Sequence, residues 1–245
     1  MPTRSPTKPT PRGPDPRSGV TRQRLIDVAQ EVFCEQGFRT ATVREICSRA
    51  SANIAAVSYH FEDKEGLYRA VIAQAKCHAD EVHPTRPPTT SDPELDLRRF
   101  VKAFAQRLLT TDACAAHGKL MAWEMIEPTR ALDDLVRDAI RPTWEHLAGI
   151  VSRILRVPTA DALTSRVVRR CTASVLAQVL LYRNCRAVVE RLHPDVLRDA
   201  AEMDQIADHV ADFSLAALRG LRAPKSPTSR VGRKPSRKPR RAVPR

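Results

Sequence analysis

Apolar residues recur every three or four positions through most of this 245-residue chain, with polar residues between them. Near the N-terminus, Leu25, Ala29 and Val32 fall on one face of an expected helix, and Gly37 follows as its end. We find no alternation of apolar and polar residues of the kind that marks a strand, and aromatic residues make up only 4% of the chain. The pattern predicts an all-α fold.

Three capping residues divide the next segment into short helices. Thr42 begins a Thr-Val-Arg-Glu capping box, Asn53 is suited to cap the following helix, and Asp63 precedes a fourth helix that runs to about Val82. Only a turn of small residues separates the second helix from the third. Two short helices joined in this way form a helix-turn-helix, whose second helix fits the major groove of DNA. The pattern therefore predicts double-stranded DNA as a partner.

The third helix directs Val57 and Phe61 toward the core and leaves small and polar side chains on its outer face. On that face, Ile54 can meet a thymine methyl group, and Lys64, at the positive N-terminus of the fourth helix, can bind phosphate. Arg44 opposes the dipole of the second helix, which favours a role in contacting guanine. We expect DNA contacts from Thr42, Arg44, Asn53, Ile54, Ala55, Ser58, Tyr59, His60 and Lys64.

A Pro- and Thr-rich linker, HPTRPPTTSDP, separates this unit from a longer helical region. There the pattern predicts several helices, including a long one over about Ala162–Leu192 and a last one over about Met203–Leu221. The expected organisation is a disordered basic arm, a three-helix helix-turn-helix domain, a larger C-terminal domain and a disordered basic tail, over residues 1–20, 21–83, 92–221 and 222–245.

The positive charge of the chain is concentrated at its two ends. The formal net charge is +13, but residues 1–24 hold six basic side chains and one acidic one, and residues 221–245 hold ten basic and none acidic. The rest is nearly neutral, so charge alone does not make the folded part a nucleic-acid-binding surface. The ends can add a salt-dependent, sequence-independent attraction to phosphates.

The motifs of enzymes, metal sites and membrane proteins are missing from the sequence. The six cysteines are not in Cys-x-x-Cys pairs and no histidines have zinc-finger spacing, so we expect neither a metal nor a cofactor. No nucleophile–base motif stands out, no signal peptide is evident, and no apolar run reaches the roughly 20 residues that span a membrane. The expectation is a non-enzymatic, cytoplasmic protein without a membrane partner.

The stretches LIDVAQEVFCEQGFRTATVREICSRA and VSYHFEDKEGLYRAV resemble the DNA-binding region of the TetR family of bacterial transcriptional repressors. This resemblance covers Thr21 to about Ala75. Ser51–Ala52–Asn53 stands where the family usually has a Gly-Val-Ser turn, and Ser58 where a tyrosine is frequent. The stretches RFVKAFAQRLL, WEMIEPTRALDDLV, IRPTWEHLAGIVSRIL and HVADFSLAALRGL look like the C-terminal domain of the CecR-like branch of that family.

The resemblance implies a ligand-responsive homodimer that binds a palindromic operator. It also implies that the last two long helices, over Ala162–Leu192 and Met203–Leu221, form a four-helix bundle between subunits. The wide apolar stripe of the first of these helices gives modest support to that arrangement, with a core within one chain as the alternative. The stripe consists of Val168, Val175, Leu176, Val179 and Leu180.

Helical bundles bind ligands between their helices, so the C-terminal domain is expected to hold an unknown small-molecule effector. Aromatic residues and methionines at helical spacing can line such a pocket, but they more often belong to a core. Glu124 and Arg183 are the polar candidates. The candidate pocket residues are Phe104, Met121, Trp123, Glu124, Met125, Trp144, Tyr182 and Arg183.

The C-terminal sequence SRVGRKPSRKPRRAVPR is similar to an AT-hook, a basic segment that enters a narrow A·T-rich minor groove. Its candidate contacts are Arg233, Lys234, Arg237 and Lys238. We favour the simpler interpretation, a solvated basic tail with non-specific phosphate affinity. The sequence thus predicts a ligand-responsive dimeric repressor, with an architectural DNA-binding protein dominated by its tail as the alternative function.

Overall fold

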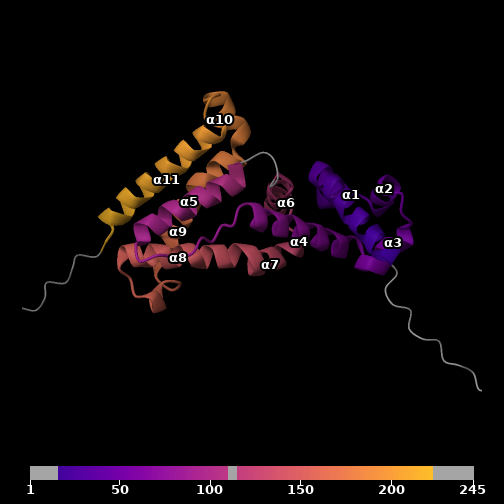
Figure 1. Ribbon diagram of the computed structural model, residues 1–245, viewed down its shortest axis with the longest axis horizontal. Coiled ribbons are helices and arrows are strands. Elements are labelled where there is room, and N and C mark those ends of the chain that lie inside the picture. The colour runs from indigo at the N-terminus through magenta and orange to yellow at the C-terminus, as the bar shows by residue number, and fades with distance from the viewer. Residues whose placement is uncertain (1–15, 110–114, 223–245) are drawn as a thin grey trace, which may run out of the picture.

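The computed structural model describes residues 16–109 and 115–222, and every regular element within these ranges is a helix (Figure 1). The prediction of an all-α fold is confirmed. The N-terminal part consists of α1 (Pro16–Thr40), α2 (Val43–Arg49), α3 (Ile54–Phe61) and α4 (Lys64–Val82). The C-terminal part consists of α5 (Pro93–Leu109), α6 (Ala115–Ile126), α7 (Ala131–Leu135), a π-helical segment (Val136–Ile140), α8 (Arg141–Leu155), a 3-10 turn (Thr159–Asp161), α9 (Arg166–Asn184), α10 (Arg186–Leu192) and α11 (Ala200–Gly220).

Helix α1 begins at Pro16, so the prediction of a disordered arm over residues 1–20 is wrong for its last five residues. Proline suits the first turn of a helix because the N–H it lacks would have no partner there. At the other end Gly37 has a φ of 75°, which kinks the helix where its end was predicted. Residues 1–15 lie outside the described residues.

A first hydrophobic core joins the helices of the N-terminal part. Val57 and Phe61 of α3 are buried in it, as the sequence predicted. The rings of Phe33 and Tyr68 meet edge to face with centroids 4.8 Å apart, an arrangement that aromatic pairs favour. Because this face of α3 points inward, its opposite face is presented to solvent.

A second core lies between α5, α8, α9 and α11. The buried carboxylate of Asp96 ties the preceding linker to this core, because it accepts hydrogen bonds from Arg153 at 2.7 Å and from the Thr90 backbone at 2.9 Å. Burial alone would raise the pKa of Asp96, but these hydrogen bonds outweigh it and hold the pKa below its usual value.

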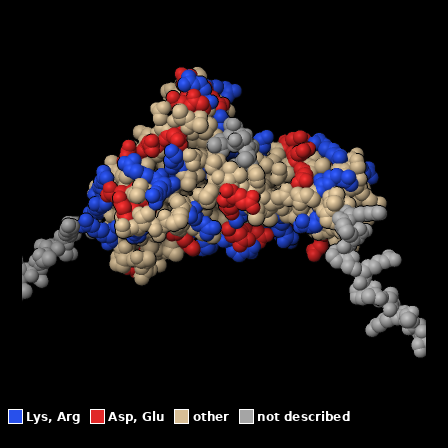
Figure 2. Space-filling model, in the orientation of Figure 1, with Lys and Arg blue, Asp and Glu red and all other residues tan. Residues whose placement is uncertain are grey.

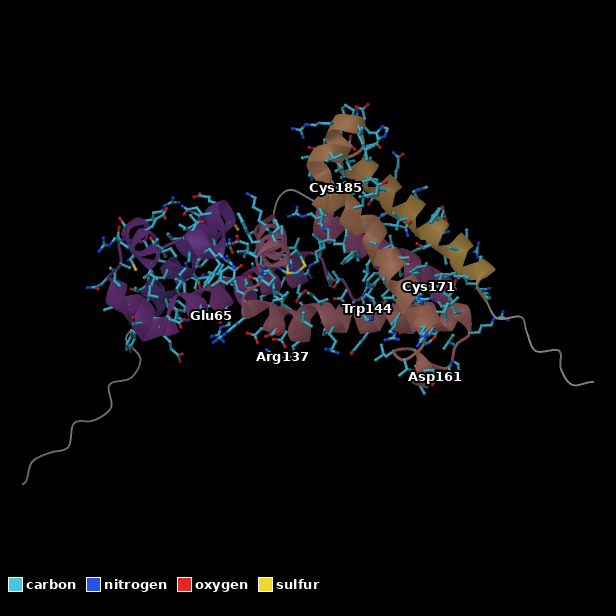
Figure 3. All side chains as sticks on the ribbon, turned by 180° about the vertical axis from the view of Figure 1, so that it is seen from behind. Glu65, Arg137, Trp144, Asp161, Cys171 and Cys185 are labelled. Carbon is cyan, nitrogen blue, oxygen red and sulfur yellow. The ribbon has the colours of Figure 1, made fainter. Side chains whose placement is uncertain are left out.

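The prediction of a single long helix over Ala162–Leu192 is wrong. A helix begins only at Arg166, and α9 ends at Asn184, where Cys185 turns the chain into the separate helix α10 (Cys185 is labelled in Figure 3). Beyond the break, Arg186 donates to the Leu109 carbonyl at 3.2 Å, which joins the start of α10 to the end of α5, and it pairs with Glu190 within α10 at 2.7 Å. The apolar spacing continues through the break, so it gave no signal of two helices.

Helix α6 connects the two parts of the molecule. It packs against both α1 and α4, and Leu120 of α6 together with Ala131 and Leu135 of α7 is buried in the first core (Figure 1). The two parts are therefore linked by packing as well as by the linker. Basic and acidic side chains are interspersed on the face shown in Figure 2, in line with the nearly neutral middle of the sequence.

Candidate nucleic-acid interface and effector cavity

The caps predicted for the helix-turn-helix are present. The Thr42 hydroxyl accepts from the backbone N–H of Glu45 at 3.2 Å, and the Asn53 side chain accepts from that of Ala55 at 2.9 Å. Capping satisfies N–H groups that otherwise lack a partner at the start of a helix. The two caps define where α2 and α3 begin.

The outer face of α3 is open to solvent. Tyr59 is 80% exposed and Ile54 is 49% exposed. The Tyr59 ring lies edge-on to that of His60, with centroids 4.8 Å apart. Of the residues predicted to contact DNA, those on exposed positions are Thr42, Arg44, Asn53, Ile54, Ala55, Ser58 and Tyr59, and His60 is half-buried beside them.

Two arginines of α2 differ in their freedom to bind another molecule. Arg49 is held by Glu35 at 3.1 Å and Glu45 at 2.7 Å. Arg44 is exposed and forms no ion pair with any residue in the described ranges. Arg44 is therefore the arginine of this helix that can reach a phosphate or a base.

Lys64, expected to bind phosphate, has contacts within the chain instead. Its ammonium donates to the Arg39 carbonyl at 3.3 Å and lies 4.5 Å from the centroid of the Phe38 ring. Burial lowers its pKa. Asp63 already caps the start of α4 by accepting from the Gly66 N–H at 2.7 Å. This end of α4 is therefore less open to an anion than the sequence suggested.

A cavity of about 270 Å³ lies between α4 of the N-terminal part and α5, α6, α8, α9 and the π-helical segment of the C-terminal part. Its volume is just below the range of about 300–1,000 Å³ that is common for ligand pockets. Five of the predicted pocket residues line it, and Trp144 is labelled in Figure 3; the five are Phe104, Met121, Met125, Trp144 and Arg183.

Three predicted pocket residues lie elsewhere. Trp123 packs on Gly37 of α1, and its indole N–H donates to the Cys34 carbonyl at 3.4 Å. Glu124 is fully buried and accepts from the hydroxyl of Thr129 at 3.0 Å. Tyr182 packs against the second core. Sequence spacing placed these residues on helices but could not show which face of each helix meets the cavity.

The cavity also contains a charged cluster that the sequence analysis missed. Asp80 forms ion pairs with Lys76, at 2.9 Å, and with Arg107, whose Nη2 lies 3.3 Å from His117 Nε2. Burial, and secondly the charge of Arg107, lower the pKa of His117 to about 4, so its ring is neutral at pH 7. On amphipathic helices these residues resemble solvated positions, and only the tertiary packing brings them together.

Across the described ranges, no group of His, Cys, Asp and Glu is arranged to hold a metal ion, and no helix is long and apolar enough to cross a bilayer.

Sequence comparison relates both halves of the chain to transcription regulators. The family described as bacterial regulatory proteins, tetR family, matches residues 25–71, and the C-terminal domain of the HTH-type transcriptional dual regulator CecR matches residues 93–220. The CecR regulator of Shigella flexneri is 30% identical over 174 residues, which cover 66% of this chain and 75% of that protein. The regulator SrpR of Pseudomonas putida is 36% identical over 89 residues, 36% of this chain and 38% of that protein.

Solved structures share the fold at lower sequence identity. A transcriptional regulator from Rhodococcus sp. Rha1 aligns over 80% of this chain and 96% of its own, with a TM-score of 0.55 and 19% identity. A TetR-family regulator from Mesorhizobium loti aligns over 83% of this chain and 98% of its own, with a TM-score of 0.52 and 19% identity. This chain belongs to the TetR family of DNA-binding helix-turn-helix transcription regulators, a non-enzymatic class, and has a CecR-type C-terminal domain.

Proposed function

We propose that the chain is a homodimeric repressor that binds a palindromic operator, and that a small effector in the cavity changes its affinity for DNA. The observation that carries the proposal is the position of α6. One face of this helix lines the cavity through His117, Met121 and Met125, while Trp123 packs on Gly37 at the end of α1. A ligand that moves α6 must therefore disturb the helix-turn-helix unit.

The proposed dimer uses the outer faces of α9 and α11, which pack against each other within one chain. The apolar stripe of α9 does not carry this argument, because Val168, Val175 and Val179 are buried in the second core of their own chain. The support is instead an outward surface of large apolar and small residues. It consists of Ala173, Ala177 and Leu181 on α9 and Phe213, Ala216, Ala217 and Gly220 on α11.

Effector and operator would act on the same two-state equilibrium. Their coupling is a free energy, so the operator must change the affinity for the effector by the same factor by which the effector changes the affinity for the operator. A confirmed effector whose affinity is the same with and without operator DNA would refute this part of the proposal.

Selection of bound fragments from a random DNA pool tests the operator at about 0.15 M salt, where exposed charges are screened beyond roughly 8 Å. The full chain is compared with a chain lacking residues 223–245. Arg222 is kept, because it donates to the Ile154 carbonyl at 3.0 Å and pairs with Glu94 at 2.5 Å. A palindrome selected by both proteins supports α3 as the reader.

An A·T-rich bias without a palindrome, lost with the deletion, would instead favour the architectural function of the tail. The residues proposed for that function, Arg233, Lys234, Arg237 and Lys238, lie outside the described residues.

Within the helix-turn-helix, Arg44→Ala should weaken operator binding about 5- to 150-fold if Arg44 contacts a base, while Arg191→Ala on α10 should leave it unchanged.

A further inference from the structure

The cavity carries more positive than negative charge. Its lining contains four Lys or Arg side chains and two carboxylates, and its histidine is neutral at pH 7. Asp80 is already shared by Lys76 and Arg107, and Asp138 binds Arg137, outside the lining, at 2.8 Å. Neither carboxylate is therefore available to balance the charge of Arg183.

Arg183 of α9 is half-buried and has no carboxylate partner within the described ranges. Burial, and secondly the charge of the neighbouring Arg186, lower the pKa of Arg183. Both effects disfavour the positive charge of its guanidinium. The guanidinium lies against Gly118 of α6, where an added Cβ would be 2.2 Å from Arg183 Nη2. The glycine leaves the space that this cation occupies.

The remaining wall of the cavity is largely apolar. It brings together side chains from α5, α6, α8, α9 and the π-helical segment, namely Phe104, Leu108, Met121, Ile140, Trp144, Leu176 and Leu180. Arg107 and Arg183 both lie beside the His117–Gly118 part of α6. The cavity thus offers a cationic region and an apolar one, and its volume limits the occupant to a small molecule.

We propose that the effector is a small organic carboxylate with an apolar body, its carboxylate paired with Arg183 and its body packed against Trp144. This inference rests on the proposed function, because it names the class of ligand for the same cavity. A carboxylate matches the planar, forked guanidinium with two parallel hydrogen bonds, and it supplies the missing negative charge. An amine of the same size would add a further positive charge beside Arg183.

Octanoate, octanamide and octylamine test the proposal, because they share one alkyl chain and differ in charge at pH 7. Isothermal titration of the full chain should show octanoate binding about tenfold or more tightly than octanamide, and no binding of octylamine. Arg183→Gln should abolish the preference for octanoate. Arg130→Gln makes the same charge change at an exposed position outside the cavity lining and should retain the preference.

Gly118→Ala provides a second variant if Arg183→Gln fails to fold. It keeps every charge but displaces the guanidinium, so it should weaken octanoate more than octanamide. Equal or tighter binding of octanamide, octanoate preference that survives both variants, or no binding of any of the three compounds would overturn the ligand class.

The fragment selection described above uses no ligand, so the two proposals can fail separately. A palindromic operator without a preference for octanoate would refute only the proposed ligand class. A preference for octanoate without a palindromic operator would refute only the proposed repressor function.

Discussion

At Gly66 the first turn of α4 passes over the end of α3 so closely that no side chain fits. A Cβ there would lie 1.9 Å from the carbonyl oxygen of Phe61, and because that neighbour is backbone, Gly66→Ala must displace one of the helices. We expect a loss of about 1–3 kcal/mol of unfolding free energy, as for other overpacked sites. Urea unfolding followed by circular dichroism measures it.

Gly149→Ala is the matched control for this substitution. Nothing lies within 4 Å of a Cβ added at Gly149, inside α8, so the exchange should stabilise the protein by about 0.5–1 kcal/mol. Effects of the same sign in the two variants would contradict the explanation from contact with the Phe61 carbonyl.

His117 should make the protein less stable in mild acid. Its pKa falls from 6.5 to about 4 because it is buried and, secondly, because it lies beside Arg107. As the pH drops below 6.5, His117 becomes protonated in the unfolded chain, whereas in the folded chain it stays neutral until about pH 4. Protonation therefore favours the unfolded chain, and stability is lost across this pH range. The loss is on the order of 3 kcal/mol.

His117→Gln removes the titrating ring and should flatten the fall in unfolding free energy between pH 6.5 and 4. His78→Gln, an exposed histidine on α4, should leave the fall unchanged. Denaturant unfolding at half-unit pH intervals compares them with the unchanged chain. Parallel curves for all three proteins would show that another group controls the acid response.

At the scale of elements, Trp123 joins α6 to the last turns of α1. Its indole ring lies over Gly37, where an added Cβ would be 2.9 Å from the ring. The indole N–H donates a hydrogen bond to the Cys34 carbonyl. Trp123→Ala removes both contacts, so the backbone amides of residues 34–40 should exchange hydrogen faster. Mass spectrometry of exchanged peptides measures this, with α10 as the internal reference. Trp123→Phe, which keeps an aromatic ring, should have a smaller effect; an unchanged rate in both would refute the link.

The elements that the sequence predicted best are those whose ends depend on local contacts. Thr42, Asn53 and Asp63 cap their helices through hydrogen bonds that reach two or three residues along the chain, so the motif alone defines them. At the break beside Cys185, by contrast, Arg186 contacts Leu109, 77 residues away. A contact of that range leaves no trace in the apolar spacing.

The candidate sites differ in the same way. The exposed face of α3 follows from the burial of Val57 and Phe61, which helical spacing predicts. The cavity requires helices from five parts of the chain to meet, and its charged lining residues have the spacing of solvated positions. Sequence reasoning therefore found Arg183 but missed Arg107 and His117, whose role depends on tertiary packing.

At the scale of the whole molecule, the proposed binding to a palindromic operator needs two reading helices held at a fixed separation. The described part of a single chain supplies one, α3, at the opposite end from α9 and α11 (Figure 1). In the proposed dimer, pairing through α9 and α11 would leave α3 of each chain outside the interface. Because half-sites on one face of DNA are spaced by whole helical turns, a change in that separation alters operator affinity without any change in α3.

The proposed dimer is the feature on which the proposed mechanism depends, and Phe213 tests it. This side chain is 60% exposed on α11 beside Ala216 and Ala217, and a stable interface of about 1,200–2,000 Å² would bury it. Phe213→Glu places a charge in that interface, so sedimentation should give the 27.4 kDa mass of one chain, and operator affinity should fall with it. Ile126→Glu, 72% exposed at the end of α6, should remain dimeric. A Phe213→Glu protein that still sediments as a dimer would place the interface elsewhere.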